Sequence, residues 1–189
     1  MTEAAALRTL VLRRAEEEDL TELVRLRDAA AHWQAASGIR QWKPGELGVD
    51  HFRARLREGE VWLAFLGPDG PCAGAWELWW EDPAAWGPQP PVAGYVHRLM
   101  TDRQSAPPGT GRELLAAAER RIAEAGREVC RLDCLADNPR LRRYYQEAGY
   151  TVVREVPKHG DGGRHYAVTL LQKRLTGACP APGAGARVP

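Results

Sequence analysis

The stretch from Thr101 to Gly126 constrains the fold more than any other part of this sequence. A strand-like segment ends at Thr101, a loop rich in glycine and proline follows, and hydrophobic periodicity predicts a helix over residues 110–125. Gly126 stands where a helix commonly ends. A strand that passes through such a turn into an amphipathic helix is typical of a sheet that is covered by helices.

The turn before this helix has the composition of an anion-binding loop. Gly109 and Gly111 let the backbone approach a ligand closely, because neither carries a Cβ. The first N–H groups of a helix are unpaired and carry partial positive charge, to which Arg112 would add. The sequence lacks the Gly-Lys-Ser/Thr of a P-loop, and Leu114 replaces the third glycine of a dinucleotide-binding loop. The turn therefore favours a phosphate, although Thr110 also fits a plain helix-capping role.

Pattern analysis of the whole chain predicts one domain over residues 1–175 and a disordered, Gly/Ala/Pro-rich tail over residues 176–189. Strands are expected at residues 10–14, 60–66, 72–81, 94–101, 129–135, 151–156 and 165–172. Further helices are expected at residues 16–36, 50–57 and 138–149. Asp50 is the expected N-cap of its helix, and segment 82–92 is read as an irregular, proline-rich connection. Hairpin-linked strands precede the βα crossovers, so we expect a mixed sheet in an α/β (α+β) domain.

Charge and composition exclude several classes of protein. The 189 residues include 26 Lys+Arg and 25 Asp+Glu, and this net charge of +1 argues against DNA and anionic membranes as partners. No apolar run approaches the roughly 20 residues of a membrane span, and the N-terminus lacks signal-peptide features, so a cytoplasmic protein is expected. The four cysteines have no metal-ligand spacing, and no metal is expected.

A second motif follows the strand at 129–135. Taken alone, Asn138 fits an N-cap with Pro139 at the first helical position. Tyr144 fits a buried stripe of the same helix, together with Leu141 and Ala148.

Together the two motifs resemble the GCN5-related N-acetyltransferase (GNAT) family. The loop 106–111 matches the family's Arg/Gln-x-x-Gly-x-Gly/Ala sequence, with Ala106 in place of the usual Arg or Gln. Residues 138–150 match the family's Asn-x-x-Ala-x-x-Leu/Phe-Tyr-x-x-x-Gly-Phe sequence. The resemblance implies the GNAT fold, a mixed central sheet of six to seven strands flanked by about four helices. It also implies that this sheet is splayed between the fourth and fifth strands.

The resemblance further implies acetyl-coenzyme A (acetyl-CoA) as the co-substrate, with its pyrophosphate cradled by the loop. Pro107 and Pro108 have no N–H, so the remaining amides of the loop would carry the pyrophosphate. The pantetheine arm would lie in the splay against strand backbone. The residues expected to bind acetyl-CoA are Leu99, Met100, Thr101, Ala106, Gly109, Thr110, Gly111, Arg112, Asn138 and Tyr145.

Acetyl transfer to an amine needs a base, donors for an oxyanion, for which a strand N–H near Leu99 is expected, and a proton for the departing thiolate. The resemblance places Tyr145 where family members donate that proton, although a packing role also fits this residue. Strand alternation puts His97 on one face with Leu99 and Thr101, and histidine titrates in the useful range. Glu77 is the other candidate base, because burial among tryptophans would raise its pKa. A structural role fits His97 equally well.

The acceptor site is expected in the first helix–loop–helix and in the tryptophan-rich hairpin. Gln41 and Trp42 lie in a loop whose family counterparts cover the acceptor. Trp76 and Trp79 are candidates for stacking on a cationic or aromatic amine, with core or dimer-interface packing as the alternative. Alternation puts Trp76 and Trp80 on one strand face and Trp79 on the other.

The resemblance implies an acetyl-CoA-dependent N-acetyltransferase acting on a small-molecule or peptidyl primary amine by direct attack in a ternary complex. Two alternatives stay open. One is a catalytically silent acyl-CoA-binding or regulatory protein on the same fold. The other is an acetyltransferase of aminoacyl-tRNA, for which residues 140–145 form a local basic patch. The sequence names neither the acceptor nor the oligomeric state, and a homodimer is left open.

Overall fold

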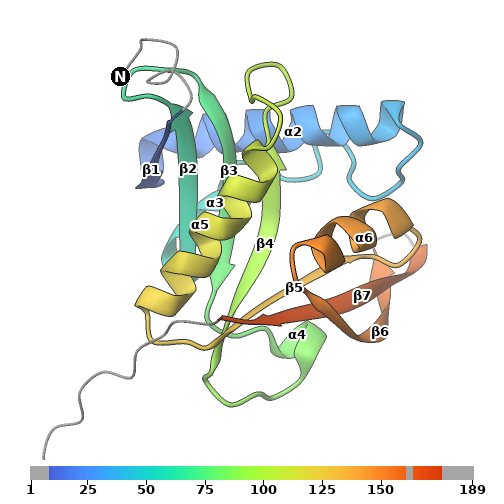
Figure 1. Ribbon diagram of the computed structural model, residues 1–189. Coiled ribbons are helices and arrows are strands. Elements are labelled where there is room, and N and C mark those ends of the chain that lie inside the picture. The colour runs from blue at the N-terminus through green and yellow to red at the C-terminus, as the bar shows by residue number, and fades with distance from the viewer. Residues whose placement is uncertain (1–8, 161–163, 176–189) are drawn as a thin grey trace, which may run out of the picture.

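A single seven-stranded sheet organises the chain (Figure 1). The computed structural model describes residues 9–160 and 164–175, and the predicted tail lies outside these residues. The strand order is β1-β2-β3-β4-β5-β7-β6, and neighbouring strands are antiparallel except for the parallel pair β4 and β5. The expected mixed sheet is therefore confirmed. The strands are β1 (Leu10–Arg14), β2 (Glu60–Leu66), β3 (Cys72–Trp79), β4 (Ala93–Thr101), β5 (Val129–Leu135), β6 (Thr151–Gly160) and β7 (Arg164–Arg174).

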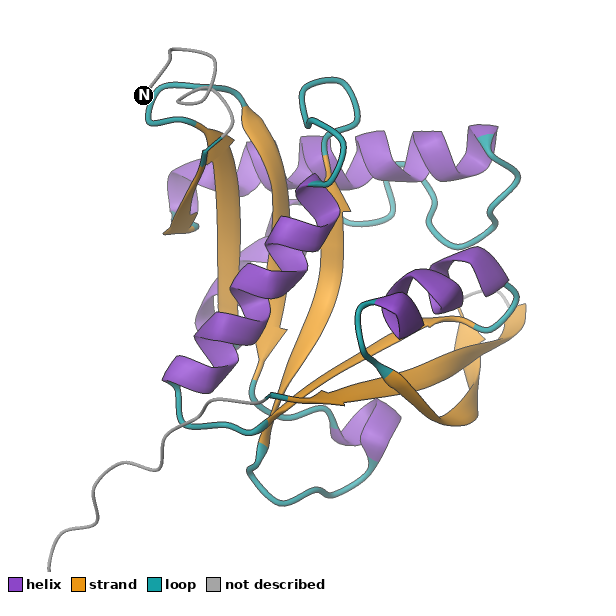
Figure 2. Ribbon diagram, viewed as in Figure 1, coloured by secondary structure: helices purple, strands orange, loops and turns teal. Residues whose placement is uncertain are grey.

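Helices cover both faces of this sheet (Figure 2). On one face lie α5 and α6, and on the other lie α2 and α3. The described residues form four helices of nine or more residues, which agrees with the number expected. The helical elements are η1 (Glu17–Asp19), α2 (Leu20–Ala36), α3 (Val49–Glu58), α4 (Pro83–Trp86), α5 (Thr110–Glu124) and α6 (Pro139–Glu147).

Two local predictions were wrong. Helix α3 has Gly48 as its N-cap, and Asp50 lies inside the first turn, where it pairs with Arg53. The proline-rich connection contains the short helix α4, whose N-terminus is capped by Asp82 accepting the Ala85 N–H at 3.2 Å. Proline at the first helical position is well tolerated, so the proline-rich segment can hold one helical turn.

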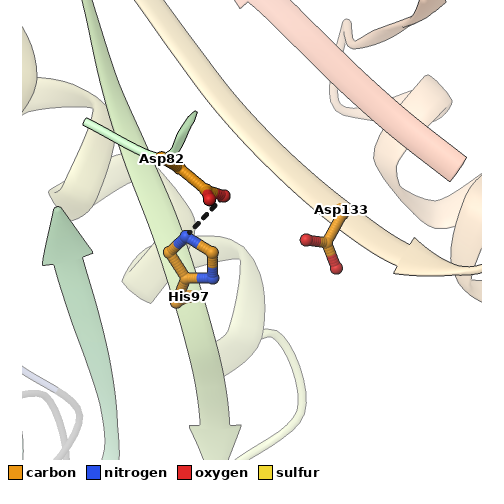
Figure 3. A group of neighbouring side chains, drawn as sticks. All are labelled: Asp82, His97 and Asp133. Atoms are coloured by element: carbon orange, nitrogen blue, oxygen red, sulfur yellow. Dashed lines mark ion pairs between the residues drawn. The ribbon is translucent and has the colours of Figure 1, made fainter. Parts of the chain in front are cut away.

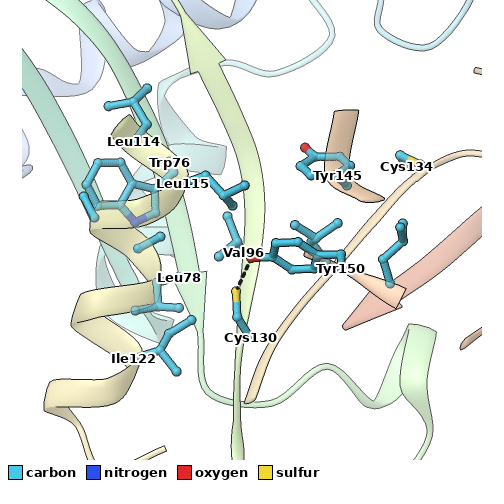
Figure 4. Packing of buried hydrophobic residues seen from close by; sticks show 14 of the residues in the cluster. Trp76, Leu78, Val96, Leu114, Leu115, Ile122, Cys130, Cys134, Tyr145 and Tyr150 are labelled. Carbon is cyan, nitrogen blue, oxygen red and sulfur yellow. Dashed lines mark hydrogen bonds between the residues drawn. The ribbon is translucent and has the colours of Figure 1, made fainter. Parts of the chain in front are cut away.

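The largest core cluster joins α5 to the centre of the sheet (Figure 4). Leu114, Leu115 and Ile122 of α5 are buried against the sheet, and each such side chain stabilises the fold by about 1.5–3 kcal/mol. Gly94 of β4 is required for this approach, because a Cβ there would lie 2.5 Å from Cγ1 of Ile122. Helix α5 therefore packs tightly on β4, and the N-terminus of α5 lies beside the C-terminal end of β4.

The sheet opens between β4 and β5, as expected for the fourth and fifth strands. The two strands pair only over residues 93–96 and 129–132. Beyond this point β4 continues beside β3 as far as Thr101, and β5 continues beside β7 as far as Leu135. The edge of β4 that faces the opening therefore carries unpaired backbone over its last residues.

A β-bulge at Arg98 changes which side chains at the end of β4 point to each face of the sheet. Glu77 pairs with His97 and Ala75 pairs with Met100, so Arg98 and Leu99 together oppose a single residue of β3. Leu99 consequently packs with the α5 core, whereas His97 stays on the opposite face. The prediction that His97 and Leu99 share a face was wrong, because the extra residue breaks the two-residue period.

Candidate active site

A hollow of about 320 Å³ lies at the N-terminus of α5, where the sequence predicts a phosphate site. Its lining residues are Thr101, Arg103, Ala106, Pro107, Pro108, Thr110 and Gly111. Gly109 is the N-cap of α5 and has φ of 97°, a left-handed conformation that favours glycine. The N-cap is therefore a residue without a side chain, which corrects the capping role considered for Thr110. The Thr110 hydroxyl instead donates to the Pro107 carbonyl at 2.8 Å.

The backbone of this turn leaves two N–H groups available for an anion. The Ala106 N–H donates to the Asp102 carbonyl at 2.7 Å, and the Thr110 N–H donates to Pro107 at 3.2 Å. Within the described part of the chain, the N–H groups of Gly109 and Gly111 make no hydrogen bond. Ala106 and Thr110 thus line the hollow without a free amide, and the two glycines are the donors that the geometry leaves for phosphate.

The two arginines of this region have different surroundings. Arg112, expected to face the phosphate, stacks on the ring of Tyr144 at 4.2 Å and pairs with Glu147 at 3.7 Å. Arg103 lines the hollow and lies 3.4 Å above the centre of the Trp33 ring. Burial and a nearby arginine lower the pKa of Arg103, as expected for a cation that has no acidic partner among the described residues. Sequence reasoning missed Arg103, although it lies in the same loop.

Of the adjacent tyrosines of α6, Tyr144 was expected in the buried stripe but is less buried than Tyr145. Tyr144 is half-buried, and its hydroxyl lies 3.0 Å from where a Cβ of residue 111 would stand. Tyr145 is 8% exposed, and its hydroxyl points toward β4 across the opening (Figure 4). That hydroxyl makes no hydrogen bond with the described residues, and burial raises its pKa. Asn138 accepts the Leu141 N–H at 3.0 Å and so serves as the N-cap of α6.

A histidine and two aspartates meet on the face of the sheet opposite α5 (Figure 3). His97 projects from β4, Asp82 precedes α4 and Asp133 projects from β5. One ligand atom from each lies within 4.8 Å of the others, close enough to share a cation or a proton. The Asp82 carboxylate is 3.3 Å from Nε2 of His97, and the Trp79 ring stacks on the imidazole at 4.0 Å between centroids.

The two carboxyl groups of this cluster differ electrostatically. Burial alone would raise the pKa of Asp82, but the nearby His97 and the Ala85 N–H outweigh burial and lower the pKa. Burial raises the pKa of Asp133, which has no hydrogen bond or ion pair among the described residues. Neighbouring acids whose pKa values are pushed in opposite directions are typical of sites that handle protons. Sequence reasoning missed both aspartates.

Glu77 is held in a different cluster and does not have the raised pKa expected of it. Its carboxylate is 1% exposed and accepts from Arg98 at 2.7 Å and from Nε1 of Trp79 at 3.1 Å. Burial would raise the pKa, but His51 and Arg98 outweigh burial and lower it. A carboxylate stabilised in its charged form is a weaker base, so the electrostatic argument for Glu77 as the base was wrong.

The predicted acceptor residues lie in three different places. Trp76 is 1% exposed and packs on Trp62 in the α5 core, so we do not retain it for the acceptor site. Trp79 lies beside His97 on the opposite face, as alternation predicts, and Arg55 stacks on its ring at 4.8 Å. Trp42 lies under the guanidinium of Arg27 at 4.2 Å, next to Gln41 in the loop between α2 and α3. Contact of Gln41, Trp42 and Trp79 with an acceptor stays a prediction.

Fold and site together define an α/β protein that presents a glycine-rich helix N-terminus beside an opening in its sheet. Residues 34–171 match the family described as acetyltransferase (GNAT) domain. The chain therefore belongs to the GNAT family of acetyltransferases. Within the described residues, no helix is both long enough and apolar enough to cross a membrane.

Several known proteins are similar to this chain. The uncharacterized N-acetyltransferase YesJ of Bacillus subtilis (strain 168) is 29% identical over 144 residues, 70% of this chain and 77% of YesJ. A GNAT-family acetyltransferase of Listeria monocytogenes is 25% identical, with a TM-score of 0.70 over 88% of this chain and 95% of that one. The protein yncA of Salmonella typhimurium, solved with its cofactor acetyl-CoA, has a TM-score of 0.63 at 18% identity, over 94% and 99% of the two chains.

Proposed function

We propose that this acetyltransferase uses acetyl-CoA to acetylate a primary amine, small or peptidyl, by direct attack in a ternary complex. One observation carries the proposal: the hollow at the N-terminus of α5 and the His97 cluster with Asp82 and Asp133 lie on opposite faces of the same opening in the sheet. An amine that enters from the His97 face would reach a thioester in the opening without crossing the sheet. The yncA complex supports acetyl-CoA as the donor.

The α5 side of the opening suits the phosphate-bearing part of acetyl-CoA. The N–H groups of Gly109 and Gly111 would bind the pyrophosphate at the helix N-terminus, and the Arg103 guanidinium would add positive charge. The unpaired edge of β4 from Leu99 to Thr101 would pair with the amide groups of the pantetheine arm.

Direct attack is favoured because the described cysteines are poor nucleophiles. Burial raises the pKa of the Cys72 thiol to about 11 and those of Cys130 and Cys134 to about 12. A thiol with such a pKa holds almost no thiolate at neutral pH. A route through an acylated cysteine is therefore disfavoured among these three residues.

His97 is the proposed base. Asp82 next to Nε2 would orient the imidazole, which leaves the other ring nitrogen to take a proton from the amine. The unpaired carboxyl of Asp133 would attract the incoming ammonium group. Asp82 therefore acts on the amine through His97, and Asp133 acts on it directly.

Tyr145 is the proposed acid. Its hydroxyl faces the opening, and its raised pKa keeps it protonated until a thiolate forms. Collapse of the tetrahedral adduct breaks the C–S bond, and the Tyr145 proton passes to the sulfur to give free coenzyme A. The phenolate then recovers a proton from solvent.

The test measures free thiol released from acetyl-CoA by the purified protein with a panel of amines. Initial rates are measured with both substrates varied, and intersecting lines in the double-reciprocal plot are expected for a ternary complex. Parallel lines would contradict direct attack. Saturable binding of acetyl-CoA with no turnover on any amine would favour the catalytically silent protein, and turnover on charged tRNA alone would favour the third function.

A further inference from the structure

The left-handed backbone at Arg98 needs a stabilising contact. Arg98 has φ of 46°, and it is the only non-glycine residue with positive φ among the residues that the structure describes. This conformation brings Cβ close to the backbone and costs free energy in every residue except glycine. Strained backbone persists only where surrounding contacts hold it, and it gathers at functional sites.

The contact that holds Arg98 is an ion pair with Glu77. The Arg98 guanidinium donates to Oε2 of Glu77 at 2.7 Å, and Nε1 of Trp79 donates to the same oxygen at 3.1 Å. Oε1 of Glu77 lies 3.7 Å from Nε2 of His51. Because Glu77 is fully buried in β3 and opposes His97, its charge attracts the neighbouring residue of β4 at a fixed point of the register.

The bulge determines which side chains and main-chain groups of β4 face the opening. It keeps His97 on the face of Asp82 and Asp133 while it turns Leu99 toward the α5 core. A bulge also leaves its extra residue out of the regular ladder, so a main-chain N–H near Leu99 is available as a donor for an oxyanion. A regular strand would leave Leu99 on the same face as His97, since one residue of slip reverses every side chain beyond it.

We propose that Glu77 is a positioning residue, which holds Arg98 in its left-handed conformation and thereby keeps the β4 bulge in its working form. The inference rests on the proposed function for its kinetic consequence, but the effect on the backbone does not. It also gives Glu77 a role different from that of a base, because the residue acts through Arg98 and not on the amine.

The kinetic experiment compares Glu77→Gln with two double variants. Glu77→Gln keeps the side-chain shape and removes the charge, and we expect kcat to fall at least tenfold with little change in KM for acetyl-CoA. Adding Arg98→Gly permits positive φ without the ion pair to Glu77, so kcat is expected to return to within about threefold of the wild-type value. Adding Arg98→Ala removes the same side chain but keeps the strain, and no recovery is expected. Equal kcat in the two double variants would overturn the proposal, as would an unchanged kcat in Glu77→Gln.

A spectroscopic experiment tests, without any turnover, whether Glu77 holds Arg98 in its left-handed conformation. The backbone ¹³Cα and ¹³Cβ chemical shifts of residue 98 report its conformation, and a change from left-handed to extended values is expected in Glu77→Gln. Left-handed shifts in Glu77→Gln would contradict the role of Glu77 in holding Arg98, whether or not the protein is an active enzyme. If the shifts change as expected but the wild type shows no activity, only the proposed function is contradicted. If Glu77→Gln does not fold, the single variants Arg98→Gly and Arg98→Ala give the same comparison with Glu77 present.

Discussion

The two sides of the opening in the sheet present different chemical groups, main-chain N–H groups on one side and side chains on the other. On the α5 side, the proposed phosphate cradle consists of main-chain N–H groups at Gly109 and Gly111 in a turn that one short segment encodes. On the opposite side, His97, Asp82 and Asp133 come from three separate segments and meet only when the sheet has formed. A site formed by main-chain groups of one turn can be predicted from local sequence. A site formed by side chains from distant segments depends on how all the strands of the sheet pair.

The largest expected effect concerns Tyr145, which reaches into the opening between the two sides. Tyr145→Phe keeps the ring and removes only the hydroxyl, so we expect kcat to fall by roughly 10²–10⁴-fold, as general acid catalysis contributes. The affinity for acetyl-CoA should hardly change. The measurement is steady-state kinetics with saturating amine, together with binding of acetyl-CoA by calorimetry.

Tyr144→Phe is the matched control, because Tyr144 is the next residue and its hydroxyl lies near Gly111 instead of the centre of the opening. A small effect on kcat is expected for it. Near-normal kcat in Tyr145→Phe would leave this residue with a packing role, and equal losses in kcat and binding would make it a positioning residue for the co-substrate.

The second prediction tests the side-chain half of the comparison. His97→Gln should lower kcat/KM about 100-fold at neutral pH and should abolish the acid limb of its pH profile, since glutamine cannot take up the amine proton. Asp82→Asn should give a smaller loss, because the imidazole remains. The pKa of Glu77 is lowered, so Glu77 is charged at every pH above its usual range and contributes no limb of its own. An acid limb that survives in His97→Gln would show that another group is the base.

Local pattern predicted the parts of this protein that a short segment determines. The strand positions and α5 follow from periodicity and turn chemistry around Gly109, whereas the opening after β4 was implied by the resemblance to the GNAT family. The bulge at Arg98 was missed because a two-residue period contains no signal for one extra residue held by Glu77 from another strand. Helix α4 was missed because four residues are too few to show a period.

The adjacent tyrosines of α6 show a second limit of the sequence. The apolar stripe of an amphipathic helix predicts a buried face, but neighbouring positions differ by only about 100° around the axis. Which of Tyr144 and Tyr145 is more buried depends on where α5 and β5 lie. Arg112 covers Tyr144 from α5, and Tyr145 packs on Tyr150 in the core.

The third prediction tests the backbone half of the comparison. Acetyl-CoA at 100 times Kd should stabilise the wild type by about 2.7 kcal/mol, and Gly111→Asp should lose most of this because it places a negative charge beside the phosphate. The measurement is the shift in Tm with acetyl-CoA. Gly111→Asn is the matched control, since it has the same size and meets the Tyr144 hydroxyl in the same way without the charge. Equal shifts in the two variants would assign the effect to crowding against Tyr144 and not to a phosphate.

The smallest expected effect separates the two arginines beside the cradle. Arg103 lines the hollow and has no acidic partner in the part of the chain that the structure describes. Arg103→Gln should therefore weaken acetyl-CoA binding about tenfold, the loss of one charge-assisted hydrogen bond of roughly 1.5 kcal/mol. Arg112 is already engaged by Tyr144 and Glu147, so Arg112→Gln should change the affinity less than twofold while it loosens the contact between α5 and α6. Titration of both variants with acetyl-CoA at low and high salt provides the comparison, because a phosphate contact weakens as salt rises. If Arg112→Gln gives the larger loss, this side chain turns from α6 to the phosphate when the ligand binds, and the cradle is not made of backbone and Arg103 alone.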